Sequence, residues 1–279
     1  MTRSHIRLLV SDVDGTLIGT DKRLAPATIA AVRDLHRAGT KLCLASSRSV
    51  RGMAMYLDEL GLETPAAGLN GAEIVAADGA VLERCTLDPE VARLTIETLT
   101  LHGIESWLFT DKDWLIRDAA GAFVPREQKA VRIAPTLVES FDGHYGAVGK
   151  IMGATTDYPL LERVEIELQA LLGDRVNAHR SSPWYLDVTD PNANKGSAAL
   201  RLAALLGIDR SEMACIGDMD NDIAMLEQAG LSIAMGNAPD HVKASAQHVT
   251  DGNNDDGWAK AVRTLVLPRA PGAASGEAV

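Results

Sequence analysis

An apolar run from Ile6 to Val10 stops abruptly and is followed by two aspartates, Asp12 and Asp14, and then by Gly15. The run is typical of a buried strand, and Gly15 indicates that the chain turns there. Because strand side chains alternate with period two, both carboxylates should lie on one side, near the carboxyl end of the strand. Two like charges so close are costly unless a cation or a shared proton relieves them. We therefore expect a ligand-binding sheet edge of the kind found in open α/β folds, with a solvated turn as the alternative.

Composition limits the classes of partner and compartment. The 279 residues suit one large domain or two smaller ones, and the net charge of −11 disfavours nucleic acid as a partner. Cys43, Cys85 and Cys215 are widely spaced, which indicates neither a disulfide framework nor a zinc site. No stretch approaches the roughly 20 apolar residues that cross a bilayer, and the chain start lacks the apolar core of a signal peptide. We expect a cytoplasmic protein without a membrane partner, either a monomer or a homodimer.

The first and last thirds of the chain alternate predicted strands with predicted helices. Apolar residues at Ile29, Val32 and Leu35 predict a helix that Gly39 ends. The other expected elements are strands over 41–45, 66–69, 213–216 and 231–234, a hairpin of 73–76 with 80–83, and helices ending at 60, spanning 195–205 and starting at 220. This strand–helix order indicates right-handed crossovers and a parallel sheet.

The middle third has a different pattern, in which strands follow one another in pairs. The expected elements are strands over 106–109, 114–117, 147–152, 175–179 and 184–188, with a helix over 158–172. Such a run indicates an α+β unit inserted into the outer domain. We therefore expect a discontinuous core domain over residues 1–85 and 190–267, an inserted domain over 86–189, and a flexible tail over 268–279.

A second predicted strand, over 213–216, also ends in a glycine followed by a carboxylate, here Gly217 and Asp218. If this strand is a parallel neighbour of the first, Asp218 reaches the same sheet edge as Asp12 and Asp14. Oxygen donors gathered in this way suit Mg²⁺, which prefers a few carboxylates together with substrate phosphate.

Further polar residues at strand and helix ends point to phosphate binding. Ser46 and Ser47 follow the strand over 41–45 and can donate hydroxyl and backbone N–H groups to a phosphate at a helix start. Lys195, at the start of its own helix, would add a compact positive charge. Each residue also has an ordinary alternative: Ser46 as a helix cap, Lys195 as a surface residue, Asp222 as a first-turn acid. Their joint occurrence favours phosphate chemistry.

Together these motifs resemble the haloacid dehalogenase superfamily phosphatases of the Cof-type subgroup, which carry a large type IIB cap. The resemblance covers nearly the whole chain apart from the tail and rests on residues 12–16, 70–71, 195–196 and 217–222. At one point the chain departs from the subgroup, because Ala45-Ser46-Ser47-Arg48 stands where Ala-Thr-Gly-Arg is usual. The implied fold is an α/β protein with a Rossmann-like parallel-sheet core and an inserted α+β cap domain.

The resemblance also implies a role for each residue at the sheet edge. Asp12 would be the nucleophile that forms an aspartyl-phosphate, and Asp14 would act as acid and then as base, which requires a raised pKa. The implied ligands of Mg²⁺ are Asp12, the backbone carbonyl of Asp14, and Asp218, with Asp222 holding a metal-bound water. The residues expected around the phosphoryl group are Ser46, Ser47, Lys195 and Asn221.

A cap of this kind would close over the cleft, exclude bulk water and select the leaving group. The expected substrate is a small phosphorylated metabolite, most plausibly a sugar phosphate. The candidate substrate contacts, all of them polar, are Arg48, Asn70, Lys150, Arg180 and Tyr185.

Several functions share this aspartate chemistry. The sequence favours a Mg²⁺-dependent phosphomonoester hydrolase. A phosphomannomutase-like phosphomutase is the nearest alternative, because the same intermediate can return phosphate to a hexose. A catalytically silent phosphate-binding regulatory module is a third, although both Asp12 and Asp14 are present. A cation pump is disfavoured by the lack of apolar spans.

Overall fold

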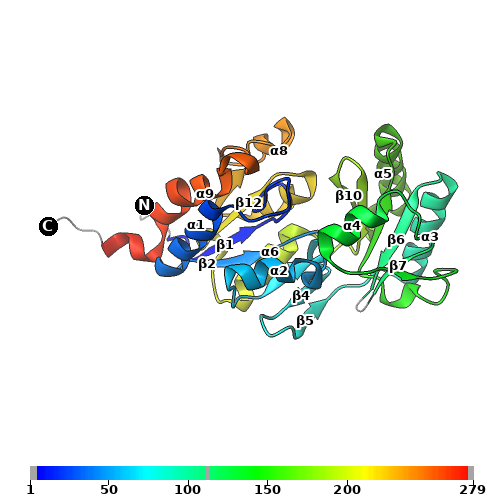
Figure 1. Cartoon of the computed structure of the whole chain (residues 1–279), viewed down its shortest axis with the longest axis horizontal. Helices are drawn as coiled ribbons and strands as arrows, with labels where there is room; N and C mark the ends of the chain where they lie inside the picture. Colours follow the sequence, from blue (N-terminus) through cyan, green and yellow to red (C-terminus); the bar gives the residue numbers. More distant parts are fainter. Residues whose placement is uncertain (1–4, 111–112, 276–279) are drawn as a thin grey trace.

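Two separate sheets divide the molecule into two lobes, which lie side by side in Figure 1. The computed structural model describes residues 5–110 and 113–275. We call the lobe around the parallel sheet the core lobe and the lobe around the larger sheet, built by strands between Glu105 and Thr189, the cap lobe. Among the described residues, no helix combines the length and apolarity needed to cross a membrane.

The core lobe is built on five parallel strands in the order β14-β13-β12-β1-β2. Their bounds are β1 Leu8–Ser11, β2 Lys41–Leu44, β12 Met213–Gly217, β13 Leu231–Ala234 and β14 His248–Val249. The expected parallel α/β sheet is confirmed, and β12 and β2 flank β1 directly. This order matters because it brings three strand ends, distant in sequence, to one edge of the sheet.

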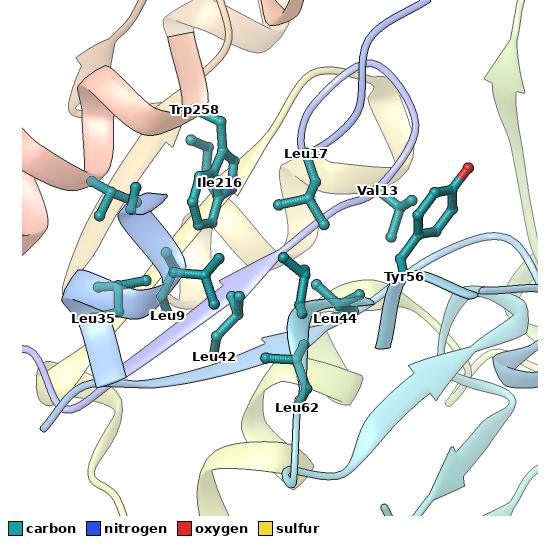
Figure 2. Close-up of a cluster of buried hydrophobic side chains, with 14 of the residues drawn as sticks. Leu9, Val13, Leu17, Leu35, Leu42, Leu44, Tyr56, Leu62, Ile216 and Trp258 are labelled. Carbon is teal, nitrogen blue, oxygen red and sulfur yellow. The ribbon is translucent and has the colours of Figure 1, made fainter. Parts of the chain in front are cut away.

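Helices cover both faces of this sheet. α1 Pro26–Arg37, α2 Val50–Leu60 and α9 Gly257–Ala261 lie on one face, and α6 Lys195–Leu205, α7 Ile223–Gln228 and α8 Asp240–Ala244 lie on the other. Strand alternation accounts for the two layers: Leu9 packs under α1, whereas Leu8 and Val10 face α6. Figure 2 shows the first layer, where side chains from β1, β2 and β12 meet Leu35 and Trp258.

A short antiparallel sheet joins the core lobe to the rest of the chain. It consists of β3 Ala66–Gly68, β4 Glu73–Val75 and β5 Val81–Arg84, and the last two strands form the expected hairpin. An isolated bridge between Ala45 and Ala67 attaches it to the end of β2. Leu69, Asn70 and Gly71 form a tight 3-10 turn between β3 and β4.

The cap lobe contains a six-stranded sheet in the order β10-β11-β9-β6-β7-β8. Its strands are β6 Glu105–Phe109, β7 Trp114–Ile116, β8 Thr136–Leu137, β9 Lys150–Ala154, β10 Asn177–Ser182 and β11 Tyr185–Thr189. α3 Pro89–Leu101 and α5 Tyr158–Leu172 cover one face. The other face carries a cluster of aromatic side chains, including Trp107, and with α4 Val124–Val131 it turns toward the core lobe (Figure 1).

The segment from residue 268 onward differs from the flexible tail that we expected. Pro271–Ser275 forms a 3-10 helix, and Ala270 is fully buried. The N–H of Ile6 donates to the carbonyl of Arg269 at 2.7 Å, and the N–H of Gly272 donates to the carbonyl of Ala38 at 3.0 Å. These bonds fix residues 268–275 against the core lobe, whereas 276–279 lie outside the described residues.

A substitution at Leu9 tests this description of the layered core directly. Replacing it in Leu9→Ala leaves a cavity between β1 and the helices above it, so we expect a loss of about 2–5 kcal/mol in the free energy of unfolding, measured by urea denaturation. The same substitution at Leu205, which is 46% exposed at the end of α6, should cost about 0.5 kcal/mol or less. Equal losses in the two variants would contradict this description of the core.

Candidate active site

Acidic side chains from two distant segments converge at the carboxyl edge of the core sheet. Asp12 follows β1, and Asp218 follows the neighbouring strand β12. Asp222 comes from the turn that leads into α7. One carboxylate oxygen of each acid lies within 4.8 Å of the other two, and all three side chains are buried. The structure therefore brings together Asp12 and Asp218, as expected from the two strand ends, and adds Asp222 to them.

Lys195 provides the buried positive charge of this cluster. It is the first residue of α6, which is capped by Asn194, and it is only 2% exposed. Its Nζ donates to Asp12 Oδ1 and to Asp222 Oδ1, both at 2.6 Å. Burial alone would lower the pKa of Lys195, but the two carboxylates raise it above its ordinary value. The alternative of a solvated surface lysine is wrong.

One ammonium group does not balance three buried carboxylates. Burial raises the pKa of Asp12 to about 7 against the opposing effect of Lys195, and the charge of Asp222 adds to the rise. Burial also raises the pKa of Asp218, with further contributions from Asp12 and Asp222. The cluster therefore favours either a bound cation or a proton.

Backbone and side-chain donors fix the two later acids in place. Asp222 Oδ2 accepts from the N–H groups of Asp218 and Met219, at 2.8 and 2.9 Å. Asp218 accepts from Thr16 Oγ1 at 2.8 Å and from Asn237 Nδ2 at 3.1 Å. Both oxygens of Asp222 thus accept from protein donors, whereas Asp218 faces residues 12–16, which we call the first motif.

Gly15 allows Asp218 to approach the first motif this closely. Its φ of +80° lies in the left-handed region, and an added Cβ would come within 2.3 Å of Asp218 Oδ2. Only glycine fits between the two acid-bearing loops at this point. The tight turn expected after Asp14 thus has a second function, which is to leave space for the carboxylate of Asp218.

Asp14 lies apart from the buried cluster and faces the cleft between the lobes. Its carboxylate accepts from Arg48 Nε and Nη2, at 2.5 and 2.7 Å, and from Lys22 Nζ at 2.5 Å. Burial would raise its pKa, but the hydrogen bonds and charges of Arg48 and Lys22 outweigh burial and hold the pKa well below the ordinary value. The expectation of a raised pKa is therefore wrong for this arrangement, because two cations, and not only Asp12, surround the group.

The two serines after β2 occupy different positions. Ser46 is buried, and its Oγ accepts from the N–H of Arg48 at 3.2 Å. Ser47 is half-buried, and its carbonyl oxygen accepts from Lys150 of the cap lobe at 2.7 Å. The cap of α2 is Ser49, whose side chain accepts from Gly52, so the alternative in which Ser46 caps this helix is wrong.

The polar residues expected around the substrate fall into two groups. The first group lies where the lobes meet and consists of Arg48, Asn70, Lys150 and Asn221. Arg48, for example, donates to the carbonyl of Ala130 in the cap lobe, at 2.5 Å. Arg180 does not join them. It pairs with Glu165 of α5 at 2.8 Å, on the helix-covered face of the cap sheet. A substrate contact by Arg180 is therefore not supported, because strand alternation turns its side chain away from the cleft.

A cleft of about 850 Å³ separates the lobes beside Asp14. Its core-lobe wall includes Lys22 and Arg48, and its cap-lobe wall includes Arg126, Glu127 and Tyr185. The guanidinium of Arg126 stacks 3.9 Å from the ring of Trp184. The cleft is thus lined by charged and aromatic side chains from both lobes, an arrangement suited to a small polar ligand.

Several residues of this region were not expected from the sequence. Thr16 and Asn237 hold Asp218, Lys22 holds Asp14, and Asp187 bonds Lys150 and Asn70. Only Thr16 lies inside a recognised motif. Lys22 and Asn237 are loop residues whose position depends on tertiary contacts, so no local pattern distinguishes them from other polar loop residues.

Comparisons with known proteins show the family to which the chain belongs. The family model for haloacid dehalogenase-like hydrolases matches residues 9–262. An HMP-PP phosphatase of Enterobacter sp. (strain 638) is 32% identical to this chain, over 87% of this chain and 89% of the Enterobacter protein. A putative phosphatase of Bacillus subtilis is 28% identical over 94% of this chain and 99% of its own.

The fold comparison is equally extensive. A solved sugar phosphatase of HAD subclass IIB superposes with a TM-score of 0.82 at 23% identity, covering 94% of this chain and 99% of the other. This likeness shows that the two-lobed architecture is shared. The family match, the phosphatase relatives and the fold together show that the chain belongs to the haloacid dehalogenase-like hydrolase family, as a Cof-type phosphatase.

Proposed function

We propose that this phosphatase hydrolyses a small phosphomonoester through an aspartyl-phosphate on Asp12, with Mg²⁺ at the acid cluster. The observation that carries the proposal is the convergence of Asp12, Asp218 and Asp222 around the single ammonium group of Lys195. Lys195 engages Asp12 Oδ1, so the other carboxylate oxygen is the attacking atom. Lys195 also places a positive charge beside the position of the transferred phosphoryl group.

The reaction divides into two displacements at phosphorus. In the first, the Asp12 carboxylate attacks phosphorus, the bond to the ester oxygen breaks, and the leaving alkoxide takes a proton from Asp14. In the second, Asp14 takes a proton from a water molecule, and the water oxygen attacks phosphorus, releasing inorganic phosphate and restoring Asp12. The contacts with Arg48 and Lys22 hold Asp14 in the carboxylate form that the second step uses. The negative charge of an arriving phosphate ester favours the protonated form that the first step uses.

The donor set fits Mg²⁺. Asp12 and Asp218 would hold the ion, together with the backbone carbonyl of Asp14, and Asp222 would orient a bound water. All of these donors are oxygens, and the uncompensated negative charge of the cluster favours a divalent cation. When bound, Mg²⁺ supplies charge neutralisation between the Asp12 carboxylate and the phosphate dianion.

The substrate is a small phosphorylated metabolite, and a sugar phosphate is the form that we propose. The cleft volume lies within the range of roughly 300–1,000 Å³ typical of small-molecule sites. Charged and hydroxyl groups on both walls, among them Lys22, Arg126 and Ser181, are suited to hydroxyl and carboxylate groups of a leaving group. The name of the Enterobacter relative, an HMP-PP phosphatase, supports a small phosphorylated metabolite as the substrate class.

The three free cysteines support a reducing, cytoplasmic location.

Asp12 is the residue whose loss should be most damaging. Asp12→Asn keeps the size of the side chain but removes the nucleophile, so we expect kcat for release of inorganic phosphate from a hexose phosphate to fall on the order of 10⁴-fold or more. The far-ultraviolet circular dichroism spectrum should not change. Asp220→Asn is the matched control and should retain turnover, because Asp220 lies between Asp218 and Asp222 in the sequence but pairs with His241 outside the cluster.

Two results would count against the hydrolase proposal. Turnover by Asp12→Asn at the rate of the unaltered protein would exclude covalent catalysis through this residue. Isomerisation of the hexose phosphate without release of inorganic phosphate would show a mutase instead.

Metal binding is tested separately, by thermal unfolding. Mg²⁺ should stabilise the folded protein by about 2.7 kcal/mol when present at 100 times its Kd, because the unfolded chain cannot assemble the cluster. We expect Asp218→Asn to lose this increase in Tm and Asp220→Asn to keep it. A metal-dependent increase that survives Asp218→Asn would place the ion elsewhere.

A further inference from the structure

A buried ion pair of the cap lobe contacts the core lobe at the edge of the candidate active site. Asp187 on β11 and Lys150 on β9 are 2% and 1% exposed, and Lys150 Nζ lies 3.2 Å from Asp187 Oδ1. In the register of these antiparallel strands, Asp187 opposes Met152 and Lys150 opposes Thr189, so the two side chains are diagonal neighbours. Both belong to the sheet face that turns toward the core lobe.

Each member of the pair also bonds a core-lobe loop. Lys150 Nζ donates to the carbonyl oxygen of Ser47 at 2.7 Å. Asp187 Oδ2 accepts from Asn70 Nδ2 at 2.8 Å, and Asn70 Oδ1 accepts in turn from Asn221 Nδ2 at 2.9 Å. The ion pair is thus connected to the two loops that carry the proposed phosphate-binding residues, Ser47 and Asn221.

The chain of bonds has a fixed direction. A carboxylate can only accept hydrogen bonds, so Asp187 requires Asn70 to present its Nδ2, which leaves Asn70 Oδ1 facing Asn221. Asn221 must then donate, and the second hydrogen of its Nδ2 stays available for an anion. Asn221 Oδ1 is buried without a hydrogen-bond partner among the described residues. Leaving a buried acceptor unpaired is costly, so the orientation of Asn221 is imposed by its neighbour.

Backbone conformation makes Asn70 a rigid link in this chain. Its φ of +57° lies in the left-handed region, and its N–H donates to the carbonyl of Ser46 at 2.9 Å. Asparagine tolerates this conformation better than most residues, because its short side chain can hydrogen-bond locally. Asn70 therefore holds its amide between Asp187 and Asn221, while its backbone is bonded to the loop that carries Ser46 and Ser47.

We propose that Asp187 is a positioning residue of this phosphatase: by fixing the amides of Asn70 and Asn221, it orients an N–H donor toward the phosphoryl group. Asp187 itself touches neither the phosphate nor the metal. The inference rests on the proposed function, because it assigns Asn221 to the phosphate site. It makes the docked cap lobe part of the phosphate site as well as a wall of the cleft.

The experiment measures the affinity for inorganic phosphate by isothermal titration calorimetry in the presence of Mg²⁺, using the full chain. Asp187→Asn has the same shape but can donate, so it no longer fixes the amide direction. We expect its Kd for phosphate to rise about tenfold, equivalent to one hydrogen bond. Asn221→Ala should produce a similar rise. The double variant with both substitutions should bind phosphate no more weakly than either single variant, because the two residues act in series.

Two further variants serve as an independent test and as a control. Asn70→Gly removes the middle link while permitting the positive φ, and it should reproduce the effect of Asp187→Asn even if that variant folds poorly. Glu165→Gln is the matched control: Glu165 is also a cap-lobe carboxylate paired with a cation, but it lies on the helix-covered face and should leave phosphate affinity unchanged.

The outcomes separate this inference from the proposed function. Multiplicative effects on Kd in the double variant, or an unchanged Kd in Asp187→Asn, would overturn the positioning role. If the unaltered protein still turned over its substrate, the hydrolase proposal would stand. Phosphate binding with the expected non-additivity, but without turnover of any phosphomonoester, would support the positioning role and reject the hydrolase. Absence of phosphate binding by the unaltered chain would overturn both.

Discussion

The contact between one buried ammonium group and two buried carboxylates underlies the rest of this structure. Lys195 lies 2.6 Å from both Asp12 and Asp222, and removing such a partner from a buried pair typically costs about 3–5 kcal/mol. The contact ties the end of β1 to the start of α6 and to the turn before α7. With Asp218 as a third carboxylate, the cluster carries two more negative charges than Lys195 balances, which is the charge of one divalent cation. The same contact thus stabilises the core lobe and, in the proposed mechanism, prepares the site for metal and phosphate.

The two aspartates of the first motif have different environments, and this difference divides the proposed chemistry between them. Asp12 points into the buried cluster, where its carboxylate faces Lys195. Asp14 points into the cleft, where Arg48 and Lys22 hold it as a carboxylate. Arg48 also bonds the carbonyl of Ala130, so the environment of Asp14 includes the cap lobe. In the proposed mechanism the carboxylate of Asp12 forms a bond to phosphorus, whereas the carboxyl group of Asp14 moves protons.

Sequence patterns could predict the features set by strand period and strand order, but not those set by loops. The strand–helix alternation predicts that the strands before Asp12 and Asp218 are parallel, and if they are neighbours their carboxyl ends must meet. The structure shows that they are neighbours. The position of the Arg180 side chain could not be predicted in this way, because the sheet face to which it points depends on the register of β10, which composition does not fix. Lys22 and Asn237 reach the site through loops with no periodic signal. The ordered segment after residue 268 was missed because its Pro- and Gly-rich composition does not reveal its bonds to Ile6 and Ala38.

In the proposed mechanism, acids distant in sequence share one divalent ion that faces the phosphorus of the substrate. The most direct test is a crystal structure with Mn²⁺ in place of Mg²⁺ and with a phosphate mimic, in which anomalous scattering locates the ion. We predict a single strong peak within coordination distance of the Asp12 and Asp218 carboxylates, with the mimic between the ion and Lys195. An ion bound elsewhere, or a mimic remote from Asp12, would contradict the claim.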